Sequence, residues 1–214
     1  MTTQNEDDVL IETVKAYVES YMSQFDASHD YAHISRVLDL AMKLQFSEQS
    51  LHPGLVYNPT IVILGALLHN VGDKKYLSAG QDAATMVSSF LLTAGCQSGL
   101  AATVQSLVTH VSFSFEKKNP AKVQAMIAQI PELAIVQDAD RLDAIGAVGI
   151  GRCFAFTGAK GGAGGLKSAV EHFEEKLETL EGMMKTDSGR TMARTRTARL
   201  KMFREWWEEE VTVS

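Results

Sequence analysis

One segment in the first third of the chain is apolar nearly all round. Residues 61–68 read Ile-Val-Ile-Leu-Gly-Ala-Leu-Leu and lead directly into His69 and Asn70. They follow Pro59, a residue that suits the first turn of a helix. We therefore predict a helix over residues 60–69. Because a helix without a polar face must be enclosed by others, this segment should form the centre of the fold.

The remaining segments also have helical patterns. Apolar residues recur at helical spacing over residues 9–24, and Ser28 or Asp30 can cap a second helix that starts near residue 30. Further helices are predicted near residues 80–94, 97–110, 120–129, 131–144, 146–156, 166–184 and 189–211. No segment alternates like a strand, and the 214 residues contain only 4 prolines. We expect an all-α fold of about eight to ten helices with little or no sheet.

The chain shows no repeat and no long interior linker, so we expect a flexible N-terminus over residues 1–8 and a single domain over residues 9–214. The longest apolar run is too short to span a bilayer, and the acidic first residues do not resemble a signal or transit peptide. We therefore expect a cytoplasmic protein that does not bind membranes. Cys96 and Cys153 form no CxxC motif, which favours two buried thiols over a disulfide framework or a zinc ribbon.

Acidic residues outnumber basic ones, and the net charge is −6. This balance excludes the basic footprint of a protein that binds nucleic-acid polymers. The glycine-rich residues 158–165 lack the Gly-Lys-Ser/Thr pattern and the preceding strand of a phosphate-binding P-loop. A helix–helix loop or a lid is the favoured interpretation of this segment. An anionic substrate would therefore have to be neutralised by a metal ion and a few local cations.

Four polar residues fall on or beside core-facing positions of three predicted helices. His33 borders an apolar stripe, His69 and Asn70 end the most apolar helix, and Asp140 lies on the helix over residues 131–144. Each could be hydrogen-bonded separately, as buried polar groups usually are. One divalent cation would satisfy all four, and imidazole with carboxylate ligands suits Mn, Fe, Co, Ni or Zn.

The strings around these residues resemble the HD-domain superfamily, whose signature is H…HD…D. They are SHDYAH at residues 28–33, LLHNVGD at residues 67–73 and QDADRLDAIG at residues 137–146. They are similar to a branch of small bacterial and fungal hydrolases of the nucleotide pyrophosphohydrolase type, over about residues 9–210. The resemblance implies a metal-dependent phosphohydrolase acting on a small phosphorylated substrate, a nucleotide in the first instance. It implies a divalent ion (Mn, Ni, Co, Fe or Mg) held by His33, His69, Asn70 and Asp140.

The chain departs from the signature at one position. Asn70 stands where the family has Asp, so an amide oxygen replaces a charged ligand. The site would bind a divalent ion less tightly and leave it more electropositive. Three explanations fit: an engineered inactivating change, a natural variant with altered activity, or a protein that has lost catalysis. The intact remainder of the motif favours the first.

Other polar residues near the motif receive expected roles. We assign Asp73 to water positioning or general acid–base catalysis, with a local turn contact as the alternative. His110 ends an apolar helix and is expected to contact phosphate, donate a proton or join a second metal. Lys74 and Lys75 are expected to neutralise substrate phosphates, with ordinary surface lysines as the alternative.

Three further residues are expected to bind substrate or support the site. His29 lies one turn before His33 and should share its face. Asp143 lies one turn after Asp140 and would orient a metal-bound water or a ligating histidine. Arg152, like Arg141, would bind phosphate, with a structural ion pair as the alternative.

Two other functions stay open. Some HD-domain proteins are diiron oxygenases, but they need additional histidines between the HD pair and the last Asp, and this chain has only His110 there. A binding protein that keeps the pocket and has lost catalysis through Asn70 is the other alternative. Either form is compatible with a homodimer.

Overall fold

A computed structural model describes residues 2–25, 30–73, 82–159 and 164–212. These residues form eleven α-helices and one 3-10 helix, and they contain no strand. The expected all-α fold is confirmed. In chain order the elements are α1 (Thr2–Met22), α2 (Tyr31–Leu51), α3 (Pro59–Leu68), α4 (Met86–Thr93), α5 (Ser98–Val111), α6 (Phe113–Lys118), α7 (Pro120–Gln129), α8 (Glu132–Asp143), α9 (Gly146–Ala159), α10 (Gly165–Glu175), η1 (Leu177–Met183) and α11 (Asp187–Val211).

The predicted central helix is α3, which packs against α1, α2, α5 and α8. Asn58 caps it through side-chain contacts to the first amides of the helix, and Pro59 occupies the first turn as predicted. Leu64, Leu67 and Leu68 are fully or almost fully buried. The enclosure follows from the apolar sequence, since every face of the helix gains from burial.

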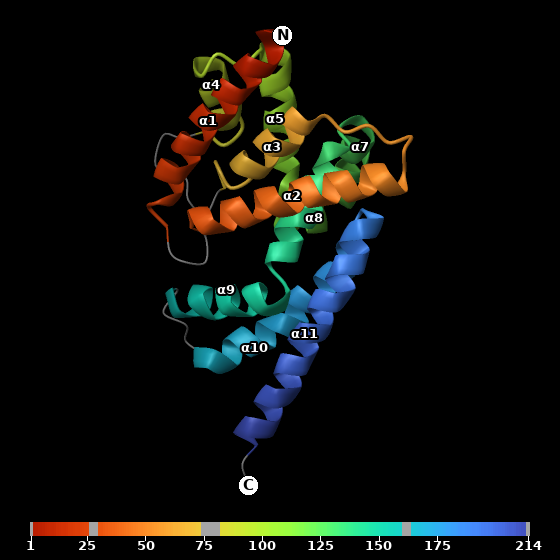
Figure 1. Ribbon diagram of the computed structural model, residues 1–214. Coiled ribbons are helices and arrows are strands. Elements are labelled where there is room, and N and C mark those ends of the chain that lie inside the picture. Colours follow the sequence, from red (N-terminus) through yellow and green to blue (C-terminus); the bar gives the residue numbers. More distant parts are fainter. Residues whose placement is uncertain (1, 26–29, 74–81, 160–163, 213–214) are drawn as a thin grey trace.

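Helix α2 lies across the middle of the molecule, between a bundle formed by α1 and α3–α8 and a second group formed by α9–α11 (Figure 1). Helix α8 connects the two groups because it packs against α2, α3 and α5 as well as α9 and α11. The start of α1 and the end of α11 lie at opposite ends of the molecule (Figure 1). A site at the junction of α2, α3 and α8 is therefore surrounded by helices from both groups.

The structure differs from the predicted helices in two places. The single helix expected over residues 166–184 is broken at Lys176, whose φ of −137° is not helical, and continues as η1. A short helix, α6, was not predicted. It forms because the Ser112 side chain accepts a hydrogen bond from the Phe115 backbone amide, a cap that operates without any apolar periodicity.

No single helix among the described residues is long and apolar enough to span a membrane. Helices α8 and α9 pass such a test only as a pair bent by 71°. Half of the glycine-rich segment predicted as a loop or lid, residues 160–163, lies outside the described residues. Its flanks are the end of α9 and the start of α10, where Gly165 has a φ of +59° that favours glycine.

Candidate metal centre

Three of the predicted ligands converge from three helices. His33 lies in the first turn of α2, His69 directly follows α3, and Asp140 lies on α8. The Nε2 atoms of the two histidines are 3.1 Å apart, and Asp140 Oδ1 lies 3.7 Å from His33 Nε2 and 3.6 Å from His69 Nε2. The histidine side chains are 1% exposed, whereas that of Asp140 is 30% exposed. The group therefore opens to solvent on the Asp140 side.

The hydrogen bonds of the two imidazoles determine where their protons lie. His69 Nδ1 is 2.7 Å from the backbone oxygen of Ala66, which can only accept, so Nδ1 must donate. His33 Nδ1 donates in the same way to Asp143 Oδ2 over 2.8 Å. Burial lowers the pKa of His33 to about 4, so this ring is neutral at pH 7. With Nδ1 of each ring engaged, the two Nε2 atoms point toward each other beside Asp140.

The spacing of the three ligand atoms suits a cation between them. The point equidistant from the two Nε2 atoms and Asp140 Oδ1 is about 2 Å from each, close to the length of a bond from a transition-metal ion to imidazole or carboxylate. Two imidazoles and one carboxylate are a donor set for Mn, Fe, Co, Ni or Zn. Burial raises the pKa of Asp140, but His69, His33 and two arginines outweigh this effect and lower the pKa overall, so the ligand is an anion. The three residues therefore fit a divalent ion.

Asn70 follows His69 in the turn that ends α3. Its amide nitrogen Nδ2 is buried and has no hydrogen-bond partner. The nitrogen and oxygen of an amide exchange places by a 180° rotation, so the same site can present an acceptor oxygen. An unpaired buried amide is costly, and a ligand that engages it would remove that cost.

Asp143 hydrogen-bonds the Nδ1 side of the His33 ring, opposite Nε2. Its carboxylate, 2% exposed, accepts hydrogen bonds from His33 Nδ1 and from two atoms of Arg36: Nε at 2.8 Å and Nη2 at 3.1 Å. Arg152 Nη1 on α9 is 3.1 Å from the same carboxylate. Burial alone would raise the pKa of Asp143, but the bonds from His33 and Arg36 and the charge of Arg152 hold it far below its usual value. Asp143 thus orients a histidine, one of its two expected roles, and Arg152 forms the ion pair that was its alternative.

Arg36 is a site residue that was not predicted. It lies three residues after His33 on α2, a spacing that brings side chains onto neighbouring parts of one helix face. This spacing is the only signal in the sequence that could have found it. Its partner Asp143 is 107 residues away, which no local pattern reveals.

The other predicted site residues fall in three situations. His110 ends α5, where its Nδ1 donates to Ser106 oxygen over 2.7 Å and its ring packs edge-on against Phe115. Asp73 closes the turn after α3, with its backbone amide 3.4 Å from the Asn70 oxygen. His29, Lys74 and Lys75 lie outside the described residues. The roles expected for these five residues stay predictions.

A second group of possible ligands has a different character. Glu48, His52 and Asp187 also place one ligand atom each within 4.8 Å of one another. Here His52 Nε2 makes a 2.8 Å donor–acceptor contact with Asp187, whose other oxygen pairs with Arg190. Glu48 accepts from the backbone amide of Ser188 near the start of α11. These groups satisfy one another, so the second group needs no cation.

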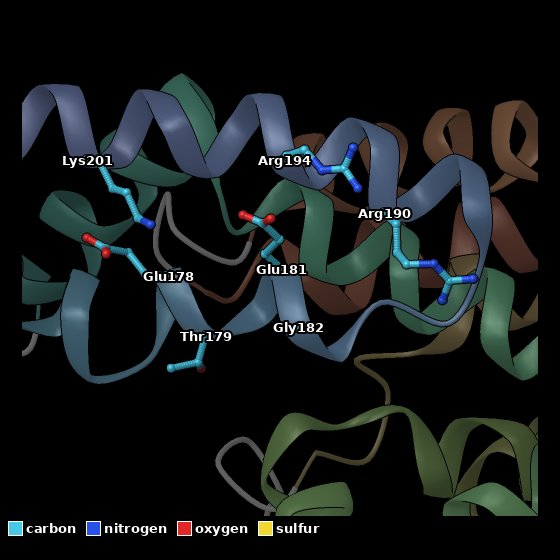
Figure 2. A pocket seen from close by; sticks show the side chains of 7 residues that line it. All are labelled: Glu178, Thr179, Glu181, Gly182, Arg190, Arg194 and Lys201. Atoms are coloured by element: carbon cyan, nitrogen blue, oxygen red, sulfur yellow. The ribbon is translucent and has the colours of Figure 1, made fainter.

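A groove of ≈ 430 Å³ lies elsewhere, between η1 and α11 (Figure 2). Acidic side chains of η1 face basic side chains of α11 across it (Figure 2). Its lining contains none of the predicted site residues and consists of Glu178, Thr179, Glu181, Gly182, Arg190, Arg194 and Lys201.

The fold and the site together define an all-α protein with a candidate metal centre built from two histidines and an aspartate. A model of the HD domain family matches residues 30–145, which include all three residues. The uncharacterized protein YpgQ of Bacillus subtilis is 37% identical over 187 residues, covering 86% of this chain and 85% of YpgQ. The chain belongs to the HD domain family.

Solved structures agree with this assignment. The crystal structure of B. subtilis YpgQ in complex with ADP is 32% identical, with a TM-score of 0.76 over 97% of this chain and 98% of that chain. An HD-superfamily hydrolase from Bacillus thuringiensis is 28% identical, with a TM-score of 0.69 over 97% and 100% of the two chains. The chain therefore has the helical fold of an HD-superfamily hydrolase.

Proposed function

We propose that the protein is a divalent-metal-dependent phosphohydrolase acting on nucleotides. The convergence of His33 Nε2, His69 Nε2 and Asp140 Oδ1 is the observation that carries the proposal. The ADP bound to YpgQ supports a nucleotide as the ligand class. When bound, the ion would polarise a phosphoryl oxygen and lower the pKa of an attacking water.

The chain's own residues divide the remaining work. His33, His69 and Asp140 hold the ion, and Asn70 adds its amide oxygen. Because Asp140 is the most exposed of the three, a substrate phosphate approaches from its side. Asp73 and His110 are the proposed acid–base residues. Lys74, Lys75 and His29 are the proposed contacts to phosphates.

Asn70 reduces the negative charge at the ion by one unit relative to the family pattern. Asn70→Asp should therefore tighten binding of Mn²⁺ or Co²⁺ by at least about tenfold, since a carboxylate in contact with a divalent ion contributes more than 1.4 kcal/mol even at high dielectric. Titration calorimetry of both proteins with each metal alone measures this difference. An unchanged affinity would remove residue 70 from the ligand set.

The activity test compares four proteins on a nucleotide panel with Mn²⁺, Co²⁺, Ni²⁺ or Mg²⁺. Release of phosphate or pyrophosphate should increase in Asn70→Asp, disappear in His69→Gln and remain unchanged in His172→Gln, which alters a half-exposed histidine of α10. Turnover that survives in His69→Gln would overturn the proposal, as would two irons per chain with oxygen uptake. Tight nucleotide binding without turnover even in Asn70→Asp would instead identify a binding protein.

A further inference from the structure

Arg36 pairs with Asp143, and Asp143 in turn accepts a hydrogen bond from the candidate ligand His33. We infer that Arg36 is a positioning residue of the metal centre: with Arg152 it fixes the Asp143 carboxylate, which holds His33 with its Nε2 lone pair toward the ion. This inference rests on the proposed metal site. It assigns a role to a residue outside the H…HD…D motif.

The hydrogen bonds to Asp143 come from different directions. Arg36 uses Nε on Oδ1 and Nη2 on Oδ2, so the planar guanidinium spans both carboxylate oxygens. His33 Nδ1 and Arg152 Nη1 both reach Oδ2. A carboxylate that is hydrogen-bonded at both oxygens is restrained from rotating about its Cβ–Cγ bond. The hydrogen-bond acceptor for His33 is therefore fixed in direction as well as in place.

The direction matters because a neutral imidazole has two tautomers. A proton on Nδ1 leaves Nε2 free to bind a metal, whereas a proton on Nε2 blocks it. His33 selects the first tautomer only while Asp143 presents an oxygen to Nδ1. Carboxylates behind metal-binding histidines have this role in general, and their loss typically weakens metal binding by about 10–100-fold.

The two arginines come from different parts of the chain. Arg36 lies on α2 together with His33, so the imidazole ring and the arginine that holds Asp143 move together. Arg152 lies on α9, beyond the residues 30–145 that match the HD domain. Its side chain is 14% exposed, compared with 36% for Arg36. The centre thus depends on a helix outside the matched domain as well as on its own motif.

The first experiment uses Arg36→Lys, which keeps the positive charge but loses the two-point grip on the carboxylate. We expect the affinity for Co²⁺, measured by calorimetry on the full chain, to fall by about 10–100-fold. The Co²⁺ absorption spectrum should change because the His33 ligand is less ordered. Arg199→Lys makes the same exchange on the exposed face of α11 and should change neither readout. Equal affinities for Arg36→Lys and the wild type would overturn the inference.

The second experiment needs no metal. Long-range proton–nitrogen NMR of the metal-free protein reports which nitrogen of His33 carries the proton. Wild type should show the Nδ1–H form alone, and Arg36→Lys a mixture of both tautomers. The Nδ1–H form alone in Arg36→Lys would refute the positioning role even if metal binding fails for another reason. Wild-type protein that binds no Co²⁺ but shows these tautomers would refute the proposed function and leave the positioning role supported.

A double-mutant cycle separates positioning from general destabilisation. Asp143→Asn keeps the shape of the side chain but removes its charge, and it should weaken Co²⁺ binding by a similar factor. Adding Arg36→Lys to Asp143→Asn should then cost little more, because both act through the same carboxylate. Fully additive losses would show that Arg36 acts independently of Asp143 and would contradict the inference. Melting curves of each variant confirm that the chain is folded.

Discussion

The buried, neutral state of His33 makes the stability of the metal-free protein depend on pH. Its pKa is about 4 in the folded chain, compared with 6.5 for an unperturbed histidine. Between these values the unfolded chain binds more protons than the folded one, so the free energy of unfolding falls as pH decreases from 6.5 toward 4. Each pH unit in this window costs about 1.4 kcal/mol. Acidification from pH 7 to pH 5 should therefore remove about 2 kcal/mol through His33 alone.

The measurement is a difference between wild type and His33→Asn, which keeps a donor for Asp143 but does not titrate. Urea denaturation with a chelator present gives the free energy of unfolding of each protein at pH 7 and pH 5. The variant should be less stable at pH 7, and the gap should shrink by about 2 kcal/mol at pH 5 because only the wild type loses this contribution. Other titrating groups, including Asp138, cancel in the difference. A gap that stays constant would show that His33 is not held neutral by burial.

Three further effects follow from the packing and the proposed ion. Gly65→Ala would place Cβ 2.9 Å from Leu107 Cδ2, so overpacking should cost about 1–3 kcal/mol in urea denaturation. Gly189→Ala would place Cβ against Asp138 Oδ2 and should cost about 3 kcal/mol by breaking buried hydrogen bonds. Gly151→Ala, with no atom within 4 Å, should be neutral or stabilising. Removing a divalent ion present at one hundred times its dissociation constant should lower the melting temperature by about 5–10 °C. Equal stabilities of Gly189→Ala and Gly151→Ala would contradict the prediction for this pair. A melting curve unchanged by chelator would contradict the prediction for the ion.

The sequence predicted the centre of the fold better than its ends. The all-round apolar run identified α3 because periodicity and capping agreed there with the tertiary environment. The break at Lys176 was missed because residues 166–184 keep an apolar pattern that a 3-10 turn also accommodates. Helix α6 was missed because it is six residues long and depends on the Ser112 cap. Short elements carry too few periods to be recognised.

The site residues that stand out in the local sequence pattern were predicted, whereas Arg36, which acts through a long-range contact, was not. His33, His69 and Asp140 were identified because a polar residue bordering an apolar stripe needs a partner, and the structure brings them together. Arg152 was singled out from the sequence, with an ion pair as one of its two interpretations, and it pairs with Asp143. Arg36 was not predicted, since an arginine in a helix is most often a surface residue and its partner lies on a distant helix.

The burial of α3 implies very different rates for two processes beside the site: hydrogen exchange of backbone amides and exchange of a bound ion. Residues 64–68 of this helix are all buried, so their amide hydrogens should exchange with solvent only when the whole chain unfolds. His69 follows the helix directly and cannot swing outward on its own. An ion would therefore enter and leave past Asp140, by a side-chain movement far faster than global unfolding. If the proposed ion is bound, it would leave and return many times during the lifetime of a single amide hydrogen in the buried part of α3.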